Sequence, residues 1–155
     1  YRGAPMVKNP AVFVAGLLRQ CGRGIDTDRW YWRMAAAGMQ LFHPPNVSGW
    51  NDAAWLDTST LQARWNIVYD ILNAQPVPVS NDYPQTETPL EAVVAAQNAL
   101  GNPALTTETR DALLTFATNA IPATGVQSWE RGSLRAQRQN ALRHLIANSP
   151  DLHVC

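Results

Sequence analysis

The chain has 155 residues, of which 46% are hydrophobic and 15% are charged, and its twelve basic and twelve acidic side chains balance. This length suits one compact domain with a real core, and the balanced charge lacks the basic footprint of a nucleic-acid-binding protein. No apolar run approaches the roughly 20 residues that a membrane-spanning helix needs, and two distant cysteines, Cys21 and Cys155, do not make a disulfide scaffold.

Two helices are expected before residue 39. Asn9 can cap the first, with Pro10 at its first position, and Gly22 is a natural stop. The second should run from about residue 27 to residue 38, because large apolar residues recur there at helical spacing. Trp32 points away from those residues, so we expect this helix to be covered on more than one side.

A long loop, "LFHPPNVSGWNDAAWL" at its centre, is predicted over residues 39–57. Pro44 and Pro45 restrict its backbone and lower the entropy lost when it becomes ordered. Trp50 and Trp55 are expected to pin the loop onto the neighbouring helices, since each ring buries a large apolar area. The alternative is that these two rings form an exposed platform for sugars, peptides or a partner surface.

The third helix carries the clearest apolar pattern. We expect Thr58 or Ser59 to cap it and the helix to end before Pro76. Its apolar residues recur about every 3.6 positions and predict one buried face, made of Leu61, Trp65, Val68, Tyr69 and Leu72. Arg64 lies on the flank of that face, where it can hold loop carbonyls or the carboxylate of Asp57.

The second half of the chain is predicted to be a linker followed by three helices. Residues 75–89 contain four prolines and read as a linker or an extended connection, where the single domain of residues 1–155 can be subdivided. Helices should follow from Thr88 and Pro89 to residue 101, from about residue 106 to residue 120, and from Glu130 to Asn148. The arginines of the last helix are expected to be mostly solvated: Arg131, Arg135, Arg138 and Arg143.

No segment shows sustained two-residue alternation, so the predicted class is all-α. The architecture would be five or six helices, with a long ordered Pro/Trp-rich loop between the second and the third. The terminal helices and this loop would belong to one domain.

The polar residues suggest little chemistry. His43 with Asp52 nearby is a combination found in metal and acid–base sites, but the chain has no HxxxH or CxxC motif, so we expect an ordinary loop histidine. Cys21 follows the negative end of a helix, which raises a thiol pKa and disfavours a nucleophile. No catalytic constellation is recognisable, no cofactor or metal site is predicted, and a bridge between Cys21 and Cys155 stays open.

The candidate binding residues therefore come from the loop and its neighbouring helix. They are Phe42, His43, Pro44, Pro45, Asn46, Trp50, Asp52, Trp55 and Arg64.

The stretch "LFHPPNVSGWNDAAWLDTSTLQARWN" resembles the hallmark of a large bacterial family, domain of unknown function 1800. Members of that family share an L-F-x-P-P-N-V-x-G-W loop, a W-[LI]-[ND]-[TS] step and an L-x-x-R-W-N helix. "VKNPAVFVAGLLR" and "LIANSPDLHV" resemble the family near the two ends, with Asp151 and Leu152 in place of its usual pair. The resemblance is strongest over residues 41–66. It implies the C-terminal part of a longer, often exported, bacterial protein, and it brings no established activity and no catalytic residues.

Three functional hypotheses follow. The first is a non-catalytic helical module of an exported bacterial protein, which docks a missing N-terminal portion or another protein through the tryptophan-rich loop. The second is a hydrolase acting on envelope or extracellular material, to which this chain lends His43, Asn46, Asp52 or Arg64 in a composite site. The third is a carbohydrate-binding module that uses exposed indole rings. In each case the expected location is periplasmic, cell-surface or extracellular.

Overall fold

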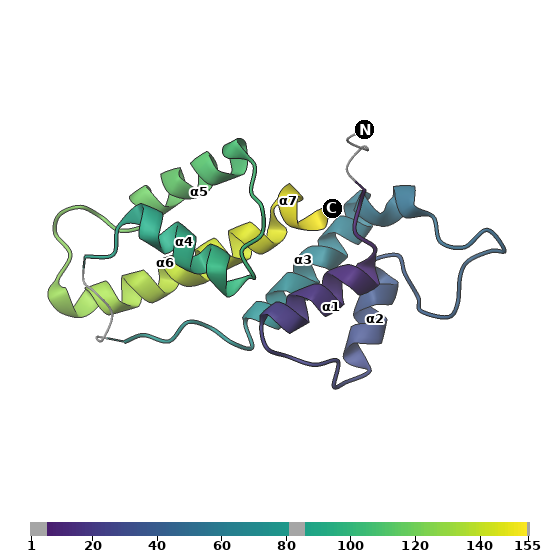
Figure 1. The fold of residues 1–155 in the computed structure, drawn as a ribbon. Coiled ribbons are helices and arrows are strands. Elements are labelled where there is room, and N and C mark those ends of the chain that lie inside the picture. Colours follow the sequence, from purple (N-terminus) through teal and green to yellow (C-terminus); the bar gives the residue numbers. More distant parts are fainter. Residues whose placement is uncertain (1–5, 81–85, 155) are drawn as a thin grey trace.

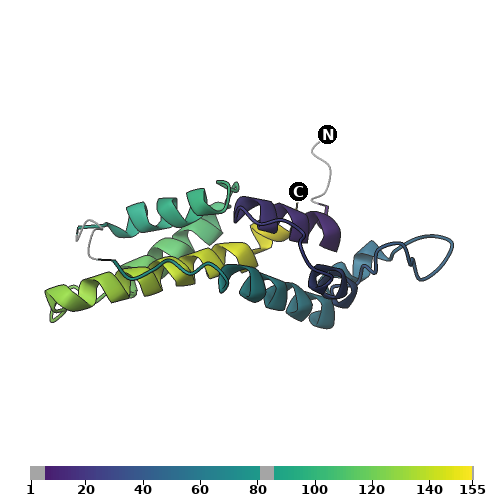
Figure 2. The ribbon, with the colours of Figure 1, turned by 90° about the horizontal axis from the view of Figure 1, so that it is seen from below.

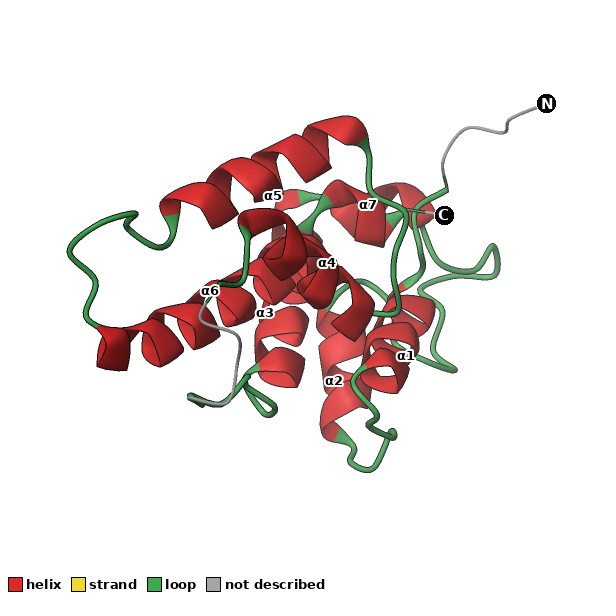
Figure 3. Cartoon of the chain, turned by 60° about the vertical axis from the view of Figure 1, so that its left-hand side comes forward, coloured by secondary structure: helices red, strands yellow, loops and turns green. Residues whose placement is uncertain are grey.

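The computed structural model describes residues 6–80 and 86–154. Within these ranges the chain forms seven α-helices and one short 3-10 helix, and no strand (Figure 3). The elements are α1 (Pro10–Gln20), α2 (Arg29–Ala36), η1 (Asp52–Leu56), α3 (Thr58–Leu72), α4 (Pro89–Ala99), α5 (Thr107–Asn119), α6 (Ser128–Asn148) and α7 (Pro150–His153). The all-α prediction is confirmed. The helix count exceeds the expected five or six because the residues after Ser149 form a short helix of their own.

Local side-chain caps set several helix starts, as the sequence predicts. Asn9 accepts a hydrogen bond at the start of α1, and Thr106 does the same at the start of α5. At the start of α4, the backbone N–H of Thr88 donates to Glu91 Oε2 at 2.7 Å, and the Glu91 N–H donates back to Thr88 Oγ1 at 3.2 Å. This reciprocal pair satisfies two backbone donors that the helix cannot satisfy itself.

The molecule is elongated, with α4, α5 and α6 at one end and α1, α2 and α3 at the other (Figures 1 and 2). The longest helix, α6, contacts α3, α4 and α5 and so joins the two ends. The first and last described segments meet beside α1, where Val7 and Val154 form an antiparallel bridge. Next to it, the Lys8 backbone N–H donates to the His153 carbonyl at 2.8 Å.

One cluster of buried apolar side chains runs through the helices of both ends. Its members come from α1 to α7 and include Leu18, Trp30, Ile67, Ile71, Val93, Leu113, Leu142 and Ile146. Residues before and after the 75–89 segment therefore share one core. None of the helices in the described part of the chain is long and apolar enough to cross a membrane.

The predicted buried face of α3 is confirmed for Val68 and Leu72 and wrong for its two aromatic residues. Trp65 and Tyr69 are 49% and 60% exposed, whereas Ile67 and Ile71 are fully buried. The helix carries two apolar stripes side by side, and the stripe of smaller β-branched residues packs against the other helices. A period of 3.6 residues fits both stripes equally well, so the pattern alone does not distinguish them.

The outer side of α2 also differs from the expectation. Trp30 and Met34 are buried as the pattern indicates, but Trp32 is largely exposed. Its ring packs edge-on against Tyr31 of the same helix, with centroids 5.0 Å apart. The prediction that α2 is covered on more than one side is therefore wrong for the described residues.

The polar side of α6 is partly buried, which corrects the prediction of solvated arginines for Arg138 and Arg143. Arg135 and Arg138 each place Nη2 at 2.8 Å from the Glu87 carboxylate. These partners lie about fifty positions away in the sequence, so spacing within α6 gives no sign of them.

Residues 75–80 run along α6 without forming a helix. The Val77 backbone N–H donates to Asn140 Oδ1 at 2.7 Å, and Asn140 Nδ2 donates to the Val77 carbonyl at 3.1 Å. Arg143 donates to the Gln75 carbonyl at 3.0 Å. Side chains of α6 thus satisfy backbone groups that have no helix or strand partner. Residues 81–85 of the predicted linker lie outside the described residues.

Candidate functional site

The connection between α2 and α3 projects from the end of the molecule that α1, α2 and α3 form (Figures 1 and 2). The sequence predicts a loop without secondary structure, but its second half contains the 3-10 helix η1. The loop therefore has two parts. One is a base, residues 50–57, that contacts the helices; the other is a tip, residues 42–49, that extends beyond them.

Trp55 fastens the base of the loop to both flanking helices. Gly38, just after α2, has a φ of +93°, and a Cβ there would lie 3.2 Å from Trp55 Cδ1 and 3.3 Å from Thr60 Cγ2. The indole ring thus lies against the end of α2 and the first turn of α3. Trp50 is half-buried as well, and the ring nitrogens of both tryptophans are buried. The pinning role predicted for Trp55 is confirmed by these contacts.

Asp57 joins η1 to α3 and is the cap of α3, in place of the predicted Thr58 or Ser59. Its carboxylate accepts the backbone N–H groups of Ser59 at 3.0 Å and Thr60 at 2.9 Å. Hydrogen bonds hold the pKa of the Asp57 carboxyl below its ordinary value, and the bond from the Thr60 backbone has the largest effect. The Thr60 hydroxyl in turn reaches the Ala54 carbonyl of η1 at 2.8 Å.

Arg64 is fully buried at the centre of this arrangement rather than on the flank of α3. Its Nε–H donates to the Trp55 carbonyl at 3.0 Å, and Nη2 donates to the Lys8 carbonyl at 2.7 Å. The guanidinium also lies over the ring of Phe13, 5.2 Å from its centroid. Burial lowers the Arg64 pKa to about 10. The expected role of holding a loop carbonyl is confirmed, whereas the Asp57 carboxylate is not its partner.

The tip of the loop is ordered by hydrogen bonds among its own residues. Asn46 Oδ1 accepts the Ser48 N–H at 2.8 Å, and the Asn46 carbonyl accepts the Gly49 N–H at 3.1 Å. Gly49 has a φ of +93°, which glycine adopts without strain. This turn presents Val47, which is fully exposed. Phe42, which is 88% exposed, lies in a preceding turn that the His43 N–H closes by donating to the Gln40 carbonyl at 3.1 Å. Pro44, Pro45 and Asn46 are exposed between them.

His43 and Asp52 are both exposed, and the structure does not bring them together. Among the described residues, neither side chain makes a hydrogen bond or an ion pair. No group of three or more histidine, cysteine, aspartate or glutamate side chains in the described ranges is placed to hold a metal ion. His43 is thus an exposed loop histidine, as the sequence suggests.

Cys21 is a half-buried free thiol. Burial raises its pKa, while Arg143 and Arg23 act in the opposite direction. The direction of the shift agrees with the sequence argument, although the main cause is burial. Cys155 lies outside the described residues, so its pairing is not addressed by the structure.

Three exposed apolar side chains, one in the loop and two on α3, were missed by sequence reasoning. Val47 was not a candidate, although its place between the turn residues Asn46 and Gly49 leaves no interior for it to face. Trp65 and Tyr69 were assigned to the core. The sequence of α3 also contains a second apolar stripe through Ile67. Its presence indicates that only one of the two stripes is buried.

The comparisons with known proteins give one result. The family model described as "Protein of unknown function (DUF1800)" matches residues 2–154. Among curated proteins and among solved structures, nothing matches the chain.

Proposed function

The chain belongs to the family of proteins of unknown function DUF1800, and we propose that it is a non-catalytic helical module that docks another polypeptide through its loop tip. The observation that carries the proposal is the contrast between the two parts of the loop. The base is fixed by Trp55 and Arg64, while Phe42 and Val47 at the tip are almost completely exposed.

The energetics favour docking by such a segment. Large apolar side chains exposed together mark interaction sites more often than solvated surface. A loop already held in one shape loses less conformational entropy when it binds, so more of the contact energy appears as affinity. Residues 39–57 contain no lysine or arginine and only two carboxylates, of which Asp57 is committed to capping α3. Little charge would therefore be desolvated when the tip is covered.

The proposed partner is the N-terminal portion of a longer parent protein or another protein. We place the parent outside the bacterial cytoplasm, in the periplasm, at the cell surface or in the medium. This location is supported by the family resemblance, and fractionation of cells that express the parent would test it.

Hydrogen–deuterium exchange tests the docking. Amides of residues 42–49 should exchange more slowly in the natural protein than in the isolated 155-residue chain. The double variant Phe42→Ser/Val47→Ser should remove that difference without changing exchange in α1 or α6. Val79→Ser, which alters an exposed valine of an irregular segment elsewhere, is the matched control. Equal exchange of the tip in both proteins would rule out docking to the N-terminal portion of the parent.

A further inference from the structure

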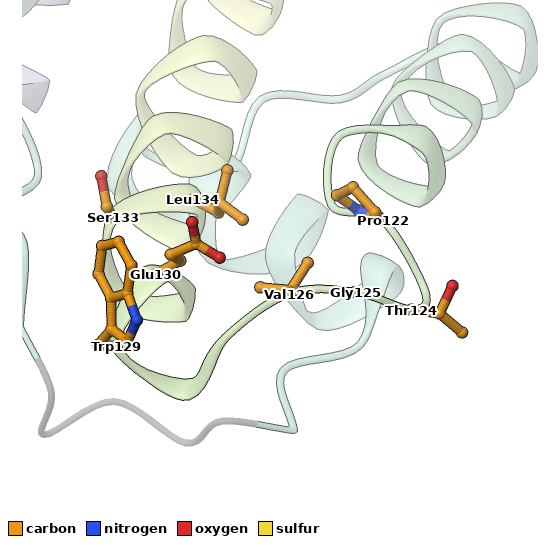
Figure 4. Close-up of a pocket in the computed structure, with 8 residues that line it drawn as sticks. All are labelled: Pro122, Thr124, Gly125, Val126, Trp129, Glu130, Ser133 and Leu134. Carbon is orange, nitrogen blue, oxygen red and sulfur yellow. The ribbon is translucent and has the colours of Figure 1, made fainter.

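A hollow of about 460 Å³ lies between the connection that follows α5 and the first turns of α6 (Figure 4). Its volume falls within the range of protein sites that hold small molecules. Residues four apart are neighbours on a helix, so α6 presents Trp129 beside Ser133 and, in the same way, Glu130 beside Leu134. The connection adds Val126 and other side chains on the opposite wall. Apolar and polar groups thus line one small space.

Trp129 supplies the broad apolar surface of the hollow. It is 74% exposed, the largest exposed fraction of any tryptophan in the chain. Trp50 and Trp55 of the loop, by contrast, are half-buried, and their ring nitrogens are buried. The electron-rich face of an indole attracts the partly positive hydrogens of C–H groups that lie flat against it. Trp129 is therefore the indole best placed to receive the flat face of a ligand.

Three polar side chains in the hollow can still form hydrogen bonds. Glu130 Oε2 accepts the Gln127 N–H at 2.9 Å, which holds the carboxylate in place, while no described residue donates to Glu130 Oε1. The carboxylate lies between the indole and the connection in the view of Figure 4. The hydroxyls of Thr124 and Ser133 make no hydrogen bond with another described residue. A carboxylate only accepts, so a ligand that binds here has to donate to it.

A ligand that matches both features has a flat apolar face and hydroxyl groups around its edge. A pyranose ring with equatorial hydroxyls has this shape, because its axial C–H bonds form the faces and its hydroxyls form the rim. We propose that the hollow binds one ring of such a neutral saccharide, with a ring face on Trp129 and a rim hydroxyl donating to Glu130. This inference goes beyond the docking function and does not depend on it, since the loop tip lies at the other end of the molecule (Figure 1).

The charge of the hollow favours a neutral sugar over an acidic one. Glu130 is the one charged side chain among the described residues that line it. An acidic sugar would place a second negative charge beside this carboxylate, whereas a hydroxyl that donates to it forms a charge-assisted hydrogen bond. Because the hollow is open and much of the ligand stays in water, we expect a dissociation constant on the order of 0.1–10 mM.

Saturation-transfer difference NMR of the natural protein with methyl β-D-glucopyranoside tests the proposal. Saturation of the aromatic protein signals should reach the axial hydrogens of one ring face more strongly than the methyl group, because the ring lies flat on the indole. Trp129→Ala should raise the dissociation constant at least about tenfold, and Trp129→Phe should raise it less. Trp32→Ala, which removes an exposed indole of α2 away from the hollow, is the matched control and should leave binding unchanged.

Glu130→Gln separates the polar contact from the start of α6. A glutamine at this position can still accept the Gln127 N–H, so the helix should begin as before. The dissociation constant should nevertheless rise about three- to tenfold, because the hydrogen bond to the sugar is no longer charge-assisted.

Two results would overturn the saccharide proposal. One is the absence of transfer at sugar concentrations well above the expected dissociation constant, or equal transfer in the wild type and in a Trp129→Ala variant that melts as the wild type does. The other is Trp129-dependent transfer to tetramethylammonium but not to the sugar, which would mean that the hollow binds an organic cation on its indole face. Neither result bears on the exchange of the loop tip, so the docking function would stand.

Discussion

Arg64 joins three parts of the chain that are distant in sequence. It donates to Lys8 before α1 and to Trp55 in η1, and it covers the ring of Phe13. No carboxylate pairs with it among the described residues. Two carbonyl oxygens and an aromatic face thus offset the desolvation of a buried cation. The planar, forked guanidinium is the feature that allows both carbonyls to be reached at once.

Arg64→Lys should therefore lower the free energy of unfolding by about 2–4 kcal/mol, because one ammonium cannot replace both hydrogen bonds and a buried carbonyl loses its donor. Urea unfolding would measure the loss, and exchange at residues 50–56 should become faster. Arg19→Lys on the exposed side of α1 serves as the control. A loss no larger than that of the control would mean that Arg64 does not hold the loop.

His153 gives the structure a pH dependence. Its ring is 2% exposed and stacks on Phe13 with centroids 4.7 Å apart. Burial first, and then the charges of Arg64 and Lys8, lower its pKa from 6.5 to about 4. The unfolded chain takes up the proton at higher pH than the folded chain does. Stability should thus be complete above pH 6.5 and should fall as the pH drops toward 4, by about 3 kcal/mol in all.

Chemical unfolding measured at several pH values between these limits would show the decline. His153→Leu should flatten most of it, because the buried ring no longer titrates. His43→Gln, which changes an exposed loop histidine, should leave the decline in place. A wild-type curve that is flat over this interval would contradict the assignment. Asp57 and Glu91, whose pKa values are lowered by hydrogen bonds from 3.8 and 4.5, add to the decline only near the acidic end of this interval and below it.

At the scale of whole elements, the sequence predicts where helices begin better than which face they bury. Caps act over three or four residues, so Asn9, Thr88 and Thr106 could be identified from local patterns. Arg138 is buried because it pairs with Glu87. Trp65 is exposed because the other helices pack against the neighbouring stripe of α3. These are long-range contacts that a periodic pattern does not encode.

The candidate site shows the same division. The turn at Asn46 and Gly49 and the pinning by Trp55 follow from residue types, whose backbone preferences and ring size act locally. The η1 helix, the cap at Asp57 and the exposure of the tip depend on how far the loop extends from the helices.

The segment that runs along α6 gives an element-scale prediction. Asn140→Ala would leave both the N–H and the carbonyl of Val77 without their partner. Loss of this pair should cost about 1–3 kcal/mol. Urea unfolding gives the energy, and exchange should accelerate at the Val77 amide. Gln137→Ala, at an exposed position of the same helix, is the matched control. Unchanged exchange at Val77 would show that α6 does not hold this segment.

For the molecule as a whole, the decisive feature is the shared core. Leu142 of α6 is fully buried in the cluster that also contains side chains of α1 and α4. Leu142→Ala should destabilise the chain by about 2–5 kcal/mol, through lost burial and a residual cavity. Because one core serves both ends, protection of α1 and α4 amides should fall by the same amount.

Native-state hydrogen exchange would measure both helices in one experiment. Leu145→Ala is the matched control, since Leu145 lies on the same helix and is 44% exposed. If the variant weakened α4 but left α1 unchanged, the two ends would unfold as separate units, and α6 would belong to only one of them. Equal losses of protection in α1 and α4 would mean that the loop is carried by a scaffold that unfolds as one body. A force applied at the tip would then be resisted by the whole molecule rather than by α2 and α3 alone.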